Sequence, residues 1–132
     1  MDESTLLNVD DEEYMNAEQL AFFDLRLQRL RQETLTEIET LRAEISQGRV
    51  SDMSDRATLE EEAIIAIRIA DRKRQLIPKI DAARQRIRQG DYGYCLQTGE
   101  AIGLARLLIR PTAEYCADVK TINERKESHY DH

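Results

Sequence analysis

The chain has 132 residues, of which 34% are charged and only 5% aromatic, a balance typical of long solvated helices rather than a large globular core. Its net charge of -7, without a dense run of Lys and Arg, disfavours direct DNA binding, because phosphate neutralisation requires clustered cations. No apolar run approaches the length of a membrane span and the acidic N-terminus is unlike a signal peptide. We therefore expect a cytoplasmic protein with reduced cysteines.

Residues 1–15 are expected to form an acidic arm that either packs on the body or stays mobile, and its early apolar residues are Leu6, Leu7 and Val9. A helix is predicted to start after it, with Asn16 as the N-cap and Gln19 three positions later. Apolar residues then recur every three or four positions, which predicts one helix of a coiled coil. This first stripe comprises Leu20, Phe23, Leu27, Leu30, Thr34, Ile38, Leu41 and Ile45.

The first helix is expected to end at Gly48, because glycine accepts the left-handed conformation found at helix C-termini. A second helix is expected to begin at Ser54 or Asp55, whose short side chains can accept from free N–H groups. Residues 16–89 would thus form a long antiparallel coiled-coil hairpin with a polar tip at 48–57. The predicted second stripe is Leu59, Glu62, Ala66, Ile69, Lys73, Leu76, Ile80, Ala83 and Ile87.

Pro78 lies inside the second predicted helix. An interior proline removes one backbone hydrogen bond and clashes with the carbonyl four residues earlier, at a cost of about 3 kcal/mol or a kink. We expect a bend at Pro78, and the alternative is two separate helices broken near Ile77.

Residues 90–132 are predicted to form a small globular unit with a C-terminal helix. The segment 91–111 contains three glycines and a short apolar run from Leu104 to Ile109, which favours compact turn-and-strand structure. Pro111 and Thr112 are expected to open the last helix, which would run to about Lys126. The expected core of this unit includes Tyr92, Tyr94 and Tyr115.

The two cysteines occupy half of a metal-binding frame. Cys95 is followed three positions later by Thr98, and Cys116 by Val119, with seventeen residues between the two frames. Four cysteines in this spacing would predict a zinc site, but two thiolates cannot close a tetrahedral shell. We therefore expect no bound metal and two buried thiols that act as small apolar side chains.

Two alternatives exist for these cysteines. His129 and His132 could supply the missing metal ligands, although they lie in a tail that we expect to fray. A disulfide between Cys95 and Cys116 could form instead, but a reducing compartment disfavours it.

Three stretches carry a specific resemblance: Asp55-Arg56-Ala57 followed by Glu60-Glu61-Glu62, then Asp91-Tyr92-Gly93-Tyr94-Cys95, then Arg110-Pro111-Thr112-Ala113 leading into Cys116. From Tyr14 to about Arg125 the chain resembles the DksA/TraR family of RNA polymerase-binding transcription regulators, and among them DksA-like members that lack part of the zinc finger. The resemblance implies a mostly α fold, in which a coiled-coil hairpin is attached to a small zinc-finger-like unit with a C-terminal helix.

The resemblance also implies a mode of action. The hairpin would enter the secondary channel of RNA polymerase, place its tip near the active site and change the stability of promoter complexes. The family's tip positions correspond to Asp52, Asp55 and Ala57, and Arg72 would face the polymerase rim. A joint site with the polymerase for the alarmone guanosine tetraphosphate (ppGpp) would use Leu76, Lys79, Arg110 and Lys120. We expect a monomer that is no enzyme, with RNA polymerase and ppGpp as partners.

Other function classes remain as alternatives. A coiled-coil adaptor for another protein would give Asp52 and Asp55 no role beyond capping a turn. An enzyme could use these carboxylates as acid and base, or Cys95 as nucleophile, but no base is partnered to a nucleophile and no phosphate-cradling loop occurs. A transcript-cleavage factor would share the acidic hairpin tip, but the zinc-finger-like unit argues against it.

Overall fold

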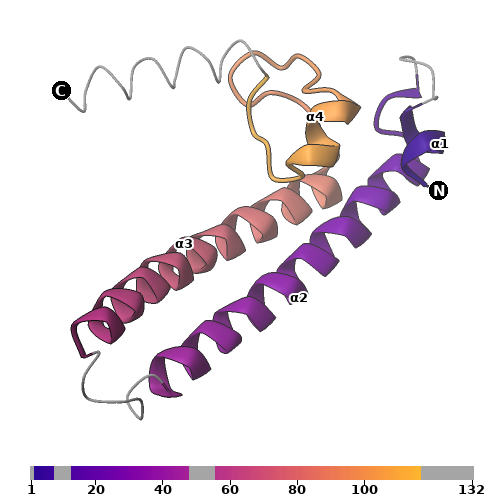
Figure 1. The fold of residues 1–132 in the computed structure, drawn as a ribbon. Helices are drawn as coiled ribbons and strands as arrows, with labels where there is room; N and C mark the ends of the chain where they lie inside the picture. The colour runs from indigo at the N-terminus through magenta and orange to yellow at the C-terminus, as the bar shows by residue number, and fades with distance from the viewer. Residues whose placement is uncertain (1, 8–12, 48–55, 117–132) are drawn as a thin grey trace. The chain divides into compact units, whose positions relative to one another are not determined.

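The structure, a computed structural model, describes residues 2–7, 13–47 and 56–116 (Figure 1). Its helices are α1 (Glu3–Leu7), α2 (Ala17–Gln47), α3 (Arg56–Gln89) and α4 (Leu104–Ile109). The described residues include no β-strand and only an isolated antiparallel bridge between Tyr94 and Ala101, so the predicted mostly α class is confirmed. None of the helices over these residues is long and apolar enough to cross a membrane.

The chain divides into two compact units. The first, which we call the base unit, comprises Met1–Leu27 and Ala82–His132. The second, which we call the hairpin unit, comprises Gln28–Asp81.

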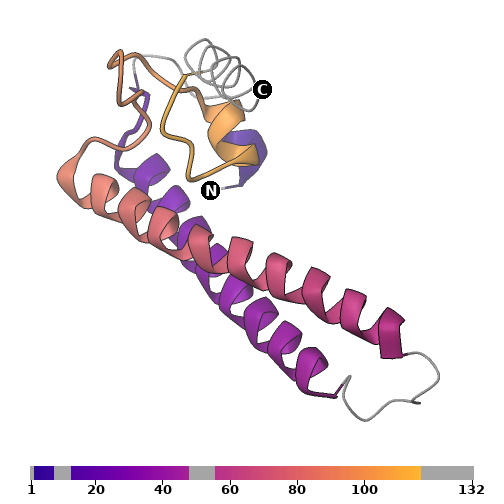
Figure 2. The same ribbon diagram turned by 90° about the vertical axis from the view of Figure 1, so that its left-hand side faces the viewer.

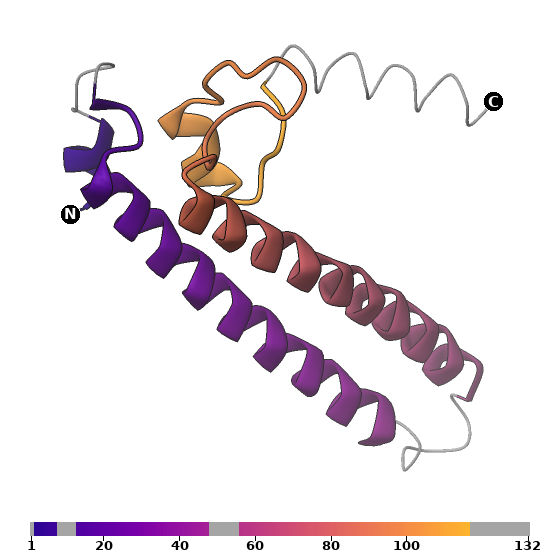
Figure 3. The same ribbon diagram turned by 180° about the vertical axis from the view of Figure 1, so that it is seen from behind.

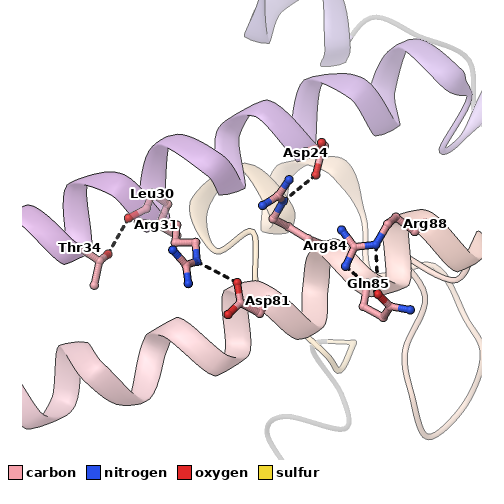
Figure 4. Close-up of polar contacts among 8 residues, drawn as sticks. All are labelled: Asp24, Leu30, Arg31, Thr34, Asp81, Arg84, Gln85 and Arg88. Atoms are coloured by element: carbon pink, nitrogen blue, oxygen red, sulfur yellow. Dashed lines mark hydrogen bonds and ion pairs between the residues drawn. The ribbon is translucent and has the colours of Figure 1, made fainter.

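In the hairpin unit, α2 and α3 run antiparallel and side by side, as the front and rear views both show (Figures 1 and 3). Thr34 and Ile38 of α2 are buried, as are Ala70 and Ile80 of α3. The Thr34 hydroxyl donates to the carbonyl of Leu30 at 2.6 Å, which satisfies this buried polar group within its own helix (Figure 4). The coiled-coil hairpin is therefore present as predicted.

Two ion pairs join the helices of the hairpin unit at its flanks. Arg31 Nε lies 2.9 Å from Asp81 Oδ1, and the Lys73 ammonium pairs with the Glu37 carboxylate. Lys73 is only half-buried, so its aliphatic stem can pack in the interface while its charged end stays at the surface. The polar interruption predicted at Lys73 therefore carries its own charge partner.

Every residue of the first predicted stripe is buried or half-buried, but the second stripe is partly wrong. Glu62 and Ile69 are exposed, whereas Ala63 is half-buried and Ala70 is buried. Spacing of three and four residues also allows the sequence of positions 59, 63, 66, 70 and 73, and that register keeps the Glu62 carboxylate in water. Burying an unpaired carboxylate would be costly, so the observed register is the favourable one.

Helix α3 continues without interruption from Arg56 to Gln89, with Pro78 inside it. The alternative of two helices separated near Ile77 is therefore wrong. Both Pro78 and Arg74 are exposed, so water can hydrate the carbonyl that loses its helical partner. The bend expected at Pro78 stays a prediction.

The start of α2 in the base unit confirms the predicted cap. The Gln19 backbone N–H donates to Asn16 Oδ1 at 2.9 Å, and Gln19 Oε1 accepts from the Met15 N–H at 2.6 Å. Both side chains thus satisfy backbone donors that a helix start leaves free.

The N-terminal arm is docked rather than loose over its described part. Helix α1 packs against α4 (Figure 2), and Leu6 is fully buried while its neighbour Leu7 is half exposed. The rest of the base core centres on Phe23 of α2 and Tyr92, whose ring centroids lie 5.5 Å apart. Val9 lies outside the described residues.

Two expectations for the C-terminal part were wrong. The apolar run Leu104–Ile109 forms α4 rather than a strand, with Leu107 buried and Ile109 88% exposed. Residues 111–116 form turns and irregular backbone instead of a helix. The Glu114 carbonyl accepts from the Leu96 N–H at 2.8 Å, so it is paired with the segment that follows Cys95 rather than within a helix. The remainder of the expected last helix lies outside the described residues.

Candidate functional site

The predicted tip lies between the end of α2 at Gln47 and the start of α3 at Arg56. Ala57 belongs to the first turn of α3. Asp52 and Asp55 lie outside the described residues, so their roles stay predictions. Because α3 begins at Arg56, Asp55 directly precedes it in sequence, which is the position where a capping side chain acts.

Arg72, Leu76 and Lys79 share one face of α3, because they follow one another at steps of four and three residues. Arg72 and Lys79 are exposed and Leu76 is half-buried. Among the residues that the structure describes, neither Arg72 nor Lys79 has an ion-pair partner. Both cations are thus available to a ligand.

Arg110 lies in the base unit, directly after α4, and is exposed. Its backbone N–H donates to the carbonyl of Arg106 at 2.8 Å, which fixes the backbone from which the side chain extends. Leu76 and Lys79 belong to the hairpin unit, and Lys120 lies outside the described residues. The convergence of these four positions on one ligand therefore stays a prediction.

The cysteine frame forms a tight loop in the base unit. The Cys95 N–H donates to the Glu100 carbonyl at 2.7 Å, and the Gly99 N–H donates to the Cys95 carbonyl at 2.9 Å. Gly99 adopts a φ of 77°, a left-handed conformation that glycine tolerates best. Cys95 is buried, Cys116 is half-buried, and both are free thiols.

Hydrogen bonding stabilises the Cys95 sulfur as a thiolate. Burial raises its pKa, but donors from the Thr98 side chain and from the backbone of Cys116, Thr98 and Gln97 outweigh burial and lower the pKa to about 6. Cys95, Thr98 and Cys116 therefore do lie together, as the frame predicts. Their chemistry does not fit a four-thiolate zinc site, because Thr98 contributes a hydroxyl that serves the sulfur as a hydrogen-bond donor.

No group of three or more His, Cys, Asp and Glu side chains in the described ranges is arranged to hold a metal ion. Val119, His129 and His132 lie outside those ranges. The expectation that the protein binds no metal therefore stays a prediction.

Contacts from distant tyrosines hold the loop that carries Cys95. The Tyr14 hydroxyl donates to the Gly93 carbonyl at 2.6 Å and accepts from the Gly103 N–H at 3.1 Å. The buried Tyr92 hydroxyl donates to the Pro111 carbonyl at 2.8 Å. These roles were not predicted from the sequence, because each partner is a backbone group far away along the chain.

Gly93 is required at its position for two reasons. Its φ is 93°, and a Cβ there would lie 2.9 Å from Met15 Cγ and 3.0 Å from the Tyr14 hydroxyl. Tyr94, expected in the core, is instead 37% exposed, although its ring meets that of Tyr14 edge-on at 5.5 Å.

An ion pair links the two helices where they enter the base unit. Arg84 Nε lies 3.0 Å from Asp24 Oδ1, and both side chains are partly buried (Figure 4). Arg88 is exposed and donates to Gln85 Oε1 within α3. The helix ends that support the cysteine loop are thus held by charge as well as by packing.

Comparison with known proteins identifies two matching families. Residues 19–87 match the DnaK suppressor protein DksA, N-terminal domain, and residues 90–125 match the prokaryotic dksA/traR C4-type zinc finger. The first match covers most of the two long helices. The second includes Cys95 and Cys116, and Thr98 and Val119 stand where the C-x2-C spacing would place the other two cysteines of a C4 frame.

Similar proteins include the RNA polymerase-binding transcription factor DksA of Caulobacter vibrioides, 41% identical over 122 residues that cover 89% of this chain and 84% of that protein. The protein of the same name from Escherichia coli K12 is 39% identical over 118 residues, covering 88% of this chain and 78% of that protein. The structure of transcription factor DksA2 from Pseudomonas aeruginosa is similar with a TM-score of 0.84 and 42% identity, covering 97% of this chain and 100% of that one.

Proposed function

The chain belongs to the DksA/TraR family of transcription regulators, which are not enzymes, and from this premise we propose that it binds RNA polymerase through the secondary channel. The observation that carries the proposal is the hairpin of α2 and α3, which is the part matched by the DksA N-terminal domain. The relatives that share it are named RNA polymerase-binding transcription factors.

The length of the helices supports insertion into a channel. Helix α2 has 31 residues and α3 has 34, so each is about 45–50 Å long at 1.5 Å per residue. Helices of this length would allow the tip residues Asp52, Asp55 and Ala57 to reach deep into the channel. In the channel, the two carboxylates act near the active site, where a dielectric constant below that of bulk water strengthens their electrostatic interactions. The consequence is a change in promoter-complex stability.

The regulator responds to ppGpp at a site that it shares with the polymerase. Lys79 and Arg110 are exposed cations, and Lys79 has no ion-pair partner in the described part of the chain, which supports their pairing with phosphate oxygens. Lys120 adds a third cation and Leu76 an apolar contact for the purine. Arg72, on the same face of α3 as Lys79, contacts the polymerase rim.

The regulator acts without zinc, without contacting DNA directly and as a monomer. The buried Tyr92 and the Tyr14 hydrogen bonds support a base unit that holds its cysteine loop without a metal. The net charge of -7 supports contact with a protein rather than with DNA.

Binding of the full chain to core RNA polymerase tests the proposal. The chain should co-elute with core polymerase, and a protein known to occupy the secondary channel should displace it. A chain that does not bind, or that binds equally well when the channel is occupied, would contradict the proposal and favour an adaptor for another partner.

A further inference from the structure

Helix α4 leads directly into the cation that the proposed function places at the ppGpp site. Arg110 follows the last residue of α4, and its backbone N–H donates to the Arg106 carbonyl at 2.8 Å. The start of the Arg110 side chain therefore moves with α4. A helix of six residues is not stable alone in water, so the position of α4 is set by the segments that pack against it.

The N-terminal arm holds α4 at two points. Helix α1 packs against α4 (Figure 2), and Leu6 is the buried residue of α1 as Leu107 is the buried residue of α4. Because burial of apolar surface stabilises such a contact, the packing of the two helices depends on these two leucines. The second point is the start of α4, where the Tyr14 hydroxyl accepts from the Gly103 N–H at 3.1 Å.

Polar contacts in turn fix α1 to α2. The Glu3 carboxylate lies 2.8 Å from Arg26 Nη1, and Asp2 Oδ1 accepts from the Thr5 N–H at 2.8 Å at the start of α1. The Glu3 side chain is 60% exposed, and exposed ion pairs contribute little to stability, whereas Leu6 is fully buried. Leu6 is thus the side chain through which α1 acts on α4.

We propose that Leu6 is a positioning residue for ppGpp, which holds α4 so that Arg110 faces the phosphate oxygens. This inference rests on the proposed function, since the proposed function assigns Arg110 to the ligand. A guanidinium pairs with phosphate through two parallel N–H groups in one plane, so its contribution depends on the direction from which it approaches. An α4 that Leu6 no longer holds would keep the cation but lose this geometry.

A purely stabilising role for Leu6 is the competing explanation. The core of the base unit centres on Phe23 and Tyr92, whose ring centroids lie 5.5 Å apart and which do not belong to the arm. Shortening Leu6 should therefore loosen α1 and α4 without unfolding the unit. The two roles differ in their effects, because lost stability lowers the fraction of folded chains, whereas lost positioning lowers the affinity of folded chains for ppGpp.

Leu6→Ala and Leu7→Ala are a matched pair of variants. Both shorten a leucine of α1 by the same groups, but Leu7 is 50% exposed and Leu6 is fully buried. For each full-length variant, one measurement is its affinity for core polymerase without ppGpp. The other is the affinity for ppGpp of the complex with polymerase, corrected for ppGpp bound by polymerase alone.

Leu6→Ala should weaken ppGpp binding about fivefold, the low end of typical coupling between sites, and should change polymerase binding without ppGpp by less than about twofold. Leu7→Ala should leave both affinities within about twofold of the wild type, as expected for an exposed substitution. Circular dichroism and thermal unfolding verify that each variant is folded. Leu6→Val, which removes less of the side chain, replaces Leu6→Ala if that variant does not fold.

Double variants separate positioning from stability. In an Arg110→Ala background, Leu6→Ala should weaken ppGpp binding no further, because the group that Leu6 positions is already gone. In a Lys79→Ala background it should keep its full effect, since Lys79 belongs to α3 and not to α4. A purely stabilising Leu6 would have the same effect in both backgrounds.

The results that contradict the positioning role differ from those that contradict the proposed function. If Leu6→Ala binds ppGpp like Leu7→Ala, or acts equally in both double variants, the positioning role is wrong while the proposed function stands. If Arg110→Ala itself leaves ppGpp binding unchanged, the assignment of Arg110 to ppGpp is wrong and Leu6 has no group to position. If the wild type does not bind polymerase, the proposed function is wrong as a whole.

Discussion

The hydroxyl of Tyr14 donates a 2.6 Å hydrogen bond to the backbone carbonyl of Gly93, across 79 positions of sequence. The same oxygen accepts from the Gly103 N–H at 3.1 Å, so one side chain satisfies two backbone groups of the segment that contains the cysteine loop. In this way Tyr14, which lies shortly before α2, fixes a loop that belongs to a zinc finger in related proteins. These two hydrogen bonds support the proposal that the loop is held without a metal.

Tyr14→Phe should therefore destabilise the protein. The substitution removes only the hydroxyl and leaves the Gly93 carbonyl and the Gly103 N–H without this partner, which should lower the free energy of unfolding by about 1–3 kcal/mol. Urea unfolding followed by circular dichroism measures the change. Tyr94→Phe is a suitable control, because Tyr94 is exposed, and its effect should stay within about 0.5 kcal/mol. Equal effects of the two variants would show that the hydroxyl of Tyr14 is not holding the loop.

The purified protein should contain no stoichiometric zinc and should stay folded in a strong chelator. Two cysteines and a threonine do not provide the four ligands of a closed tetrahedral zinc site. Elemental analysis and thermal unfolding with and without chelator measure this. The activity of the protein should also survive mild thiol oxidation better than the activity of relatives that have four cysteines. One zinc per chain together with unfolding on chelation would show that other residues, such as His129 and His132, complete a site.

The long helices could be predicted because their apolar spacing repeats over many turns, and the Asn16 cap because its signal is local. The register of the second stripe could not be predicted with the same certainty. Both Glu62 and Ala63 satisfy a spacing of three or four from their neighbours, and only the solvation of Glu62 decides between them.

The secondary structure and contacts of the C-terminal part could not be predicted, for a different reason. A run of six residues such as Leu104–Ile109 is too short to distinguish a helix from a strand by periodicity. Tyr14 and Gly93 are too far apart in sequence for any local pattern to join them. The roles proposed for Asp55 and Lys79 rest on the family resemblance, because a carboxylate or an ammonium on a highly charged chain is not distinctive by itself.

The stability of the protein should fall at alkaline pH, in part through Tyr92. Burial raises the pKa of Tyr92 above the value of about 10 that it has when unfolded. A group whose pKa is raised by folding contributes stability that is present below pH 10 and is lost as the pH rises further, because the unfolded chain releases the proton first. The free energy of unfolding should therefore decrease above pH 10.

Tyr92→Phe isolates this contribution. At pH 7 the variant loses the buried 2.8 Å hydrogen bond to the Pro111 carbonyl and should be less stable by about 1–2 kcal/mol. Above pH 10 the difference from the wild type should shrink, because phenylalanine has no proton to lose. Urea unfolding of both proteins from pH 7 to 11 gives the two curves, and a constant difference across this range would contradict the linkage.

The alarmone response should depend on Lys79, Arg110 and Lys120. Replacing each by alanine removes one charge-assisted hydrogen bond to phosphate and should weaken ppGpp binding to the polymerase complex by about 1.5–3 kcal/mol. Binding of the protein to polymerase without ppGpp should change little. Arg88→Ala is the matched control, since Arg88 is an exposed cation of α3 that hydrogen-bonds Gln85. An unchanged response in all three variants would show that the ppGpp site has been assigned to the wrong residues.

The central claim, that the tip charge acts inside the polymerase, is tested most directly by Asp55→Asn assayed at matched occupancy of core polymerase. Asparagine caps a helix about as well as aspartate, so folding and polymerase binding should be almost normal. Transcription at a responsive promoter and the lifetime of the promoter complex should nevertheless no longer be altered by the variant. Asp52→Asn should have a smaller effect, because it lies farther from the start of α3. Normal regulation by Asp55→Asn at equal occupancy would contradict the claim and reduce Asp55 to a capping residue.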